Sequence, residues 1–225
     1  MRDGQAIAGP SIGDMRDRIM EVARTLYVLR GHDGFSFGDI AEAIGTTRAN
    51  IHHHYGNKQR LMDRLIDGFV ADAEDRIARH WTAGEATFSE RLKRQVDDLR
   101  QFYERFNKAP GDRNVWSPLS RIRLDLPALG EPAVAALERL NRVYDAALHH
   151  AVSAAIKTGE LSPRTPAADV VRLLRVALLS CGPMTLDAGD FHEVAELFGS
   201  IERMIASAWG SASPNMPVDR NNRAR

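Results

Sequence analysis

The sequence predicts an all-α protein, and three observations support this fold class. Apolar residues recur at helical spacing through most of the chain between residues 14 and 209. Residues that cap helices precede several of these segments. No segment shows the apolar–polar alternation that is typical of a half-buried strand. We therefore expect an N-terminal head of three helices, followed by a C-terminal helical bundle.

The first predicted helix covers residues 14–30 and would brace the two short helices that follow it. Before it, residues 1–13 contain glycine and proline without helical spacing, and we expect a mobile arm there. The apolar stripe of the helix consists of Ile19, Val22, Ala23 and Leu26.

Residues 34–61, GFSFGDIAEAIGTTRANIHHHYGNKQRL, predict two short helices joined by a tight turn. Ser36 can cap the first helix, with Asp39 three residues later in a variant of the capping box. Gly45 ends that helix, because glycine adopts the left-handed conformation without steric cost. Either of the two threonines that follow can cap the second helix, which extends only to the histidine triplet. This layout is that of a helix-turn-helix, whose second helix enters the major groove of DNA.

The alternative is an ordinary helical hairpin in an all-helical core, and the local charge favours the DNA-binding interpretation. No acidic residue occurs from Ala43 to Met62, whereas Arg48, Lys58 and Arg60 are basic. The whole chain has 30 basic and 30 acidic residues and no net charge. Its basic residues therefore have to be concentrated on one surface if it binds a duplex.

The segment GTTRANIHHHYGNKQRL resembles the DNA-binding signature of TetR-type transcriptional repressors (the TetR/AcrR, tetracycline-repressor-like family). The resemblance covers about residues 14–65 and includes the glycine turn, the short recognition helix and the aromatic-x-x-Lys-x-x-Leu exit. The sequence departs from the family pattern at His52 and His54, where an aromatic pair is usual, and at Gly56, where proline is common. The resemblance implies a dimeric repressor that responds to a small-molecule effector.

Within this motif, Arg48 and Asn50 are the predicted base contacts, because arginine pairs bidentately with guanine and asparagine with adenine. Five other side chains suit phosphates, as hydroxyls, polar rings or a lysine at a helix N-terminus. We expect Ile51 to point inward as core. The predicted phosphate contacts are Thr46, Thr47, His53, Tyr55 and Lys58.

The histidine triplet, His52 to His54, also raises the question of a metal site. Adjacent residues on a helix diverge by about 100°, so these side chains cannot converge on one ion. Neither a cysteine nor a second histidine cluster lies nearby in the sequence. We expect no metal and no cofactor. The single cysteine, Cys181, excludes an internal disulfide and fits a reducing cytoplasm.

The rest of the chain predicts a helical body. A connecting helix from Lys58 to Trp81, capped by Asn57, would span about 36 Å between the head and the body. The further predicted helices are Phe88–Phe106, Val115–Leu124, Glu131–Thr158, Ala167 to about Leu179 and His192–Trp209, with a loop at 107–114. The predicted domains are a mobile arm at 1–13, a DNA-binding domain at 14–57, an effector-binding and dimerisation domain at 58–209 and a disordered tail at 210–225.

Two features of the body each have two interpretations. A set of five aromatic residues can line a small-molecule cavity or form plain core. The last two helices can complete a monomeric core or build a four-helix dimer interface, which is the arrangement the family resemblance implies. The predicted pocket residues are Trp81, Phe88, Phe102, Phe106 and Trp116. The predicted interface residues are Val170, Leu174, Leu178, Val194, Leu197, Ile201 and Ile205.

Together these patterns predict a homodimeric, effector-controlled transcriptional repressor that binds a palindromic operator in double-stranded DNA in the cytoplasm. No apolar run is long enough to span a bilayer, so we expect no membrane contact. The sequence contains no phosphate-binding loop, nucleophile motif or metal constellation, and we expect no enzyme activity. The remaining alternative is a helical adaptor that binds protein and not DNA.

Overall fold

The computed structural model describes residues 12–210 of the 225-residue chain. Over this range all regular structure is helical, and an isolated bridge between Leu161 and Gly210 is the single β pairing. The predicted all-α class is confirmed. In chain order the elements are α1 (Ile12–Arg30), α2 (Phe37–Ile44), α3 (Arg48–Tyr55), α4 (Lys58–Ile77), η1 (Ala78–Thr82), α5 (Phe88–Phe106), α6 (Pro118–Leu124), α7 (Leu126–Leu129), α8 (Glu131–Thr158), α9 (Ala167–Ala188) and α10 (His192–Trp209).

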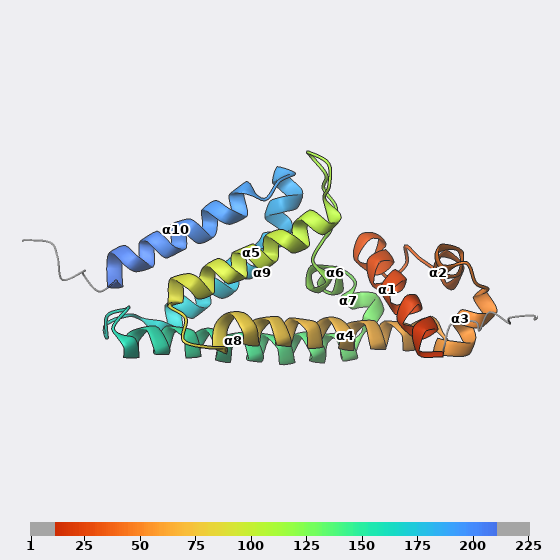
Figure 1. Ribbon diagram of the computed structural model, residues 1–225, viewed down its shortest axis with the longest axis horizontal. Helices are drawn as coiled ribbons and strands as arrows, with labels where there is room; N and C mark the ends of the chain where they lie inside the picture. Colours follow the sequence, from red (N-terminus) through yellow and green to blue (C-terminus); the bar gives the residue numbers. More distant parts are fainter. Residues whose placement is uncertain (1–11, 211–225) are drawn as a thin grey trace, which may run out of the picture.

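Figure 1 shows an elongated molecule with a small helical head at one end. The two short helices α2 and α3 lie at this end beside α1, and α4 runs from them along the length of the molecule. In the body α4 packs against α8, α8 against α9, and α9 against α10, while α5 contacts both α8 and α10. α6 contacts both α1 and α4, so this short helix joins the head to the body.

The head has a continuous apolar core, to which each of its helices contributes. Ile19 of α1, Ile40 of α2, Ile51 of α3 and Leu61 of α4 are all fully buried. The inward position of Ile51 agrees with the expectation from the sequence. Ile51 and Tyr55 are the buried residues of α3, and the opposite face of the helix is turned toward solvent.

The connecting helix differs from the predicted one at its C-terminal end. α4 ends at Ile77, and the π-helical turn η1 follows it, with Trp81 fully buried. The indole N–H of Trp81 donates a hydrogen bond to Oε1 of Gln95 at 2.9 Å, and its ring lies beside Phe88. Burial of this large side chain against α5 favours the local widening of the helix, a feature that residue spacing does not report.

The helix α9 continues past its predicted end near Leu179 and reaches Ala188, with Pro183 in its interior. Proline lacks the N–H that would bond to the preceding turn, and this costs about 3 kcal/mol in an isolated helix. The second half of α9 is nevertheless held from outside, because Trp116 donates its indole N–H to Oγ1 of Thr185 at 2.7 Å. Tertiary packing therefore overrides the local preference.

Other boundaries lie close to the predicted ones. Residues 115–117 are not helical, and α6 begins at Pro118 after the cap Ser117. Residues 12 and 13, assigned by sequence to the mobile arm, already belong to α1, and Gly210 pairs with Leu161. The rest of the predicted arm and tail lies outside the described residues. None of the helices within residues 12–210 is long and apolar enough to cross a membrane.

Candidate nucleic-acid interface

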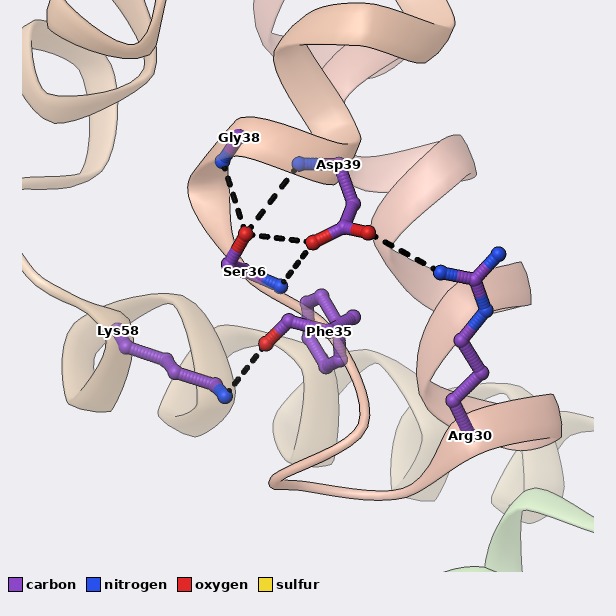
Figure 2. Close-up of polar contacts among 6 residues, drawn as sticks. All are labelled: Arg30, Phe35, Ser36, Gly38, Asp39 and Lys58. Carbon is purple, nitrogen blue, oxygen red and sulfur yellow. Dashed lines mark hydrogen bonds and ion pairs between the residues drawn. The ribbon is translucent and has the colours of Figure 1, made fainter.

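The turn between α2 and α3 has the geometry that the sequence predicts. Ser36 caps α2 through a complete capping box with Asp39, as Figure 2 shows, and its hydrogen bonds lower the pKa of the Asp39 carboxyl. Gly45 ends α2 in the left-handed conformation, with φ 68° and ψ 42°. Thr47, rather than Thr46, caps α3, and its hydroxyl accepts a hydrogen bond from the backbone N–H of Asn50 at 3.2 Å.

The exposed face of α3 is polar and basic. Arg48, Ala49, His52 and His53 are exposed, whereas Ile51 is buried against the head core. The guanidinium of Arg48 forms no hydrogen bond or ion pair with any residue that the structure describes, so all its donors remain available to a partner. No acidic side chain of α3 competes with it, because the helix contains none. This face is the candidate interface.

Asn50 is less free than Arg48. It is half-buried, and its Nδ2 donates a hydrogen bond to Oγ1 of Thr46 at 2.9 Å. This contact fixes the amide against the turn and orients the remaining N–H and the carbonyl oxygen. The hydroxyl of Thr46 still has its own hydrogen to donate.

Two of the predicted phosphate contacts are engaged inside the head. Tyr55 is buried, and its hydroxyl donates to the backbone carbonyl of Arg16 at 3.1 Å, which joins α3 to α1. Burial raises the pKa of the Tyr55 phenol. The Lys58 ammonium donates to the carbonyl of Phe35 at 2.7 Å and lies 4.8 Å from the centre of its ring, as Figure 2 shows. Both side chains therefore tie the helix-turn-helix together, a role that residue type and spacing do not reveal.

The rings of His53 and His54 lie edge-on to each other, with centroids 5.4 Å apart, and His52 packs against another residue. His52 lies edge-on to Phe37, with ring centroids 4.7 Å apart, and its Nδ1 is 2.8 Å from the carbonyl oxygen of Gly56. His53 is exposed. Burial is the first cause that lowers the pKa of His54, and the charges of His53 and Arg16 lower it further.

Two exposed arginines near the interface are not among the predicted contacts. Arg60 and Arg64 lie on the first turns of α4 and, together with His53 and His54, line a shallow depression beside α3. Their spacing of four residues places them on one face of the helix, which is the signal that would have identified them. Two carboxylates of α4 share this surface, so its charge is mixed.

The five aromatic residues of the predicted pocket do not surround one cavity. Trp81 and Phe88 pack together at the start of α5, and Trp116 lies edge-on to Tyr103, with ring centroids 6.3 Å apart. Only Phe102 and Phe106 line a common cavity, which lies between the head and the body. The single set predicted from the sequence is therefore three separate groups.

The predicted dimer-interface residues lie mainly inside the protomer. The most apolar stripes of α9 and α10 pack against the protomer's own α8 and α5, because the chain buries its most apolar surface first. Leu178 and Leu197 are half-buried, and the large apolar residues that these helices expose are Leu173, Val176, Leu179 and Met204. The buried members of the predicted set are Val170, Leu174, Val194, Ile201 and Ile205.

Comparison with known sequences identifies the head. Residues 19–65 match the family described as "Bacterial regulatory proteins, tetR family". The chain is 32% identical over 57 residues to the HTH-type transcriptional repressor KstR2 of Rhodococcus jostii, an alignment that covers 25% of this chain and 28% of the relative. It is 35% identical over 66 residues to the HTH-type transcriptional regulator TtgR of Pseudomonas putida, covering 29% and 31% of the two chains. The alignments thus span less than a third of these relatives.

Solved structures share the fold over nearly the whole chain. A TetR-family regulator from Agrobacterium tumefaciens superposes with a TM-score of 0.68 at 22% identity, covering 86% of this chain and 96% of its own. A TetR regulator from Chloroflexus aurantiacus gives 0.71 at 17% identity, covering 89% and 98%. A regulator from Saccharomonospora viridis, solved in complex with choline, gives 0.67 at 22% identity, covering 89% and 100%. Residues 19–65 thus match the DNA-binding head of the tetR family of bacterial regulatory proteins, and nearly the whole chain shares the all-helical fold of solved TetR-family regulators.

Proposed function

We propose that this protein is a sequence-specific, DNA-binding transcriptional repressor that acts as a homodimer in the cytoplasm and responds to a small-molecule effector. The observation that carries the proposal is the exposed face of α3. It presents Arg48 without an internal partner, next to a helix N-terminus whose backbone N–H groups attract phosphate. The family relatives of the head, named as repressors or regulators, support the same function.

From the contacts of the head we infer different roles for the predicted site residues. Arg48 reads a base edge, and Asn50 supports it through the amide groups that Thr46 leaves unused. Thr46, Thr47 and His53 contact phosphates from the turn and from the exposed face of α3. Tyr55 and Lys58 hold the motif in shape and do not carry phosphate affinity.

A palindromic operator requires a second head. Two heads on one face of a duplex are separated by about 34–36 Å or a multiple of it, so the body has to fix their spacing. The exposed apolar residues of α9 and α10 provide a surface for this contact. Arg175 is held beside them by an ion pair with Asp145 of α8 at 2.6 Å, which gives the surface a polar margin.

The test is selection of duplexes from a random library with the full chain, followed by gel-shift titration of the selected and random sequences at several salt concentrations. A repressor of this kind enriches a palindrome and loses affinity steeply as salt rises, because it displaces counterions from phosphates. A helical adaptor would enrich no sequence and would show no salt-dependent affinity for DNA. Arg48→Ala should weaken the enrichment and relax it at one base pair of each half-site, whereas substitution of Arg94, an exposed arginine on α5 in the body, by alanine should leave the enrichment unchanged.

A further inference from the structure

A cavity of about 280 Å³ lies at the junction between the head and the body. One wall comes from α1 of the head, and the other walls come from α4, α5 and the first residue of α6. Its volume is just below the range of about 300–1,000 Å³ that is typical of small-molecule pockets, so it suits a small ligand. A ligand in this cavity touches the DNA-binding head and the helical body at the same time.

Three phenylalanine rings from α4 and α5 line the cavity, and each already has a cation over its face. A guanidinium within about 6 Å of a ring centre is attracted by the negative face of the ring. The aromatic faces of the cavity are therefore surfaces on which the chain's own guanidinium groups lie. The pairs are Arg24 over Phe69 at 4.4 Å, Arg76 over Phe102 at 4.5 Å and Arg105 over Phe106 at 5.7 Å.

The three arginines differ in how firmly they are held. Arg24 forms an ion pair with Asp72, and Arg76 forms one with Asp98 at 3.4 Å. Arg105 is exposed, makes the longest of the three ring contacts and pairs with no carboxylate among residues 12–210. It is the cation that a ligand can most easily displace.

The unpaired charges of the lining leave an excess of negative charge. Asp17 and Glu21 of α1 line the cavity, and neither has an ion-pair partner among the residues that the structure describes. Asp72 of the lining neutralises Arg24, and Asp98, which lies outside the lining, neutralises Arg76. Two unpaired carboxylates against the single unpaired guanidinium of Arg105 then leave a net charge of −1 at this site when Asp98 is counted. An anionic ligand would face this excess, whereas a cation would neutralise it.

We propose that this junction cavity binds a small organic cation with an apolar body. The cation lies over the face of Phe106 in place of Arg105, and Glu21 and Asp17 supply the opposing charge from α1. Because α1 belongs to the head and Phe106 to the body, occupancy changes the preferred position of the head on the body. This regulatory consequence rests on the proposed function, while the binding itself does not.

The experiment is isothermal titration of the full chain with three probes of matched shape. They are benzyltrimethylammonium, the neutral 2,2-dimethyl-3-phenylpropan-1-ol and the anionic 2,2-dimethyl-3-phenylpropanoate. We expect the cation to bind at least about five-fold more tightly than the alcohol, and the anion most weakly, from the size of cation–π and ion-pair contributions. An equal response to all three probes, preference for the anion, or no binding of the cation would overturn the proposal.

Two substitutions should change the affinity for benzyltrimethylammonium in opposite directions. Glu21→Gln should weaken it by about two- to five-fold, because a carboxylate is lost, and Arg105→Gln should strengthen it by about as much, because the competing cation is removed. The matched controls Glu104→Gln and Arg94→Gln are exposed positions on α5 that do not line the cavity, and should change nothing. Weaker binding by Arg105→Gln would contradict the proposed site.

Gel-shift titration of the same preparations on random duplex separates this proposal from the proposed function. If the protein binds DNA but does not bind the cation, the cavity proposal is wrong and the proposed DNA-binding function stands. Cation binding with the expected response of the variants, but without any DNA binding, supports the cavity and removes its regulatory meaning. Circular dichroism of each variant confirms that an unchanged or lost affinity comes from a folded chain.

Discussion

The carboxylate of Asp125, which follows the last residue of α6, accepts a hydrogen bond from the backbone N–H of His32, just past the end of α1, at 2.9 Å. One turn earlier in α6, Arg121 donates to the backbone carbonyls of Val28 and Leu29 at 3.0 and 3.1 Å. One end of α6 therefore binds the last turn of α1 through a carboxylate and a guanidinium. This contact holds the head in a defined position on the body, beside the junction cavity.

The first prediction concerns this contact. Asp125→Ala should lower the free energy of unfolding by about 1–2 kcal/mol, because a half-buried N–H loses its acceptor. Asp125→Asn keeps an acceptor oxygen of the same shape and should lose less. Urea unfolding measures the difference, and hydrogen exchange of the His32 amide should be faster in Asp125→Ala alone. If the His32 amide exchanges at the same rate in Asp125→Ala and in Asp125→Asn, the hydrogen bond to residue 125 does not protect this end of α1.

The second prediction concerns base recognition. Arg48→Ala should cost about 1–3 kcal/mol of binding free energy on the selected operator and relax the preference at one base pair, because a bidentate contact to a base is lost. His53→Ala should weaken selected and random duplexes alike, since a phosphate contact carries no sequence information. Gel-shift titration on a panel of single-base operator variants measures both effects. If His53→Ala changes the preferred base and Arg48→Ala does not, His53 is the base contact and the assignment of Arg48 is wrong.

The third prediction separates internal contacts from phosphate contacts. Tyr55→Phe removes the hydrogen bond to the Arg16 carbonyl and should lower the free energy of unfolding by about 0.5–1.5 kcal/mol. Lys58→Ala removes the contact with Phe35 and should also destabilise the head. Neither should change the slope of log affinity against log salt, which falls by about one for each lost phosphate contact. If Lys58→Ala reduces the salt slope by about one, Lys58 does contact a phosphate and the internal role proposed for it is wrong.

The fourth prediction concerns the dimer. Val176, 56% exposed on α9, is a candidate interface residue, and Val176→Glu should give a folded monomer. Leu124, 61% exposed, is a matched apolar position on α6 and not on α9 or α10, and Leu124→Glu should leave the dimer intact. Sedimentation equilibrium measures the mass, and circular dichroism the fold. Ile201→Glu should instead unfold the chain, because this side chain is buried in the protomer.

The fifth prediction concerns alkaline stability. Burial raises the pKa of the Cys181 thiol from 9.0 to about 12. Below about pH 9 the thiol is protonated in the folded and the unfolded chain. Between the two values the unfolded chain loses the proton first, so the folded state loses stability as the pH rises.

The contribution of Cys181 should therefore fall by about 1.4 kcal/mol for each pH unit above pH 9, until the folded pKa is reached. Cys181→Ala removes the titrating group and should flatten this part of the pH profile, whatever its effect on stability at neutral pH. Urea unfolding of both proteins from pH 8 to pH 10.5 measures the two slopes. Parallel slopes would show that the thiol does not contribute.

The sequence by itself determined the helical class, the helix-turn-helix and the position of most helices. These features depend on local rules. Ser36 caps α2, Gly45 ends it and Thr47 starts α3, because each residue satisfies backbone groups within a few positions of itself. The absence of acidic residues around α3 is equally local. Such signals involve only residues that are close in the sequence, so they can be recognised without knowledge of the tertiary contacts.

Tertiary structure alone decided which surface each side chain faces. Tyr55 and Lys58 have the residue types of phosphate contacts, but the carbonyls of Arg16 and Phe35 lie within reach and take their hydrogen bonds. Ile201 has the character of an interface residue, but the protomer buries it first. The junction cavity joins residues of α1 to residues of α5 that are far away in the sequence. Hydrogen bonding and apolar burial depend on distances between elements, and helical periodicity fixes only the direction of a side chain around its own helix axis.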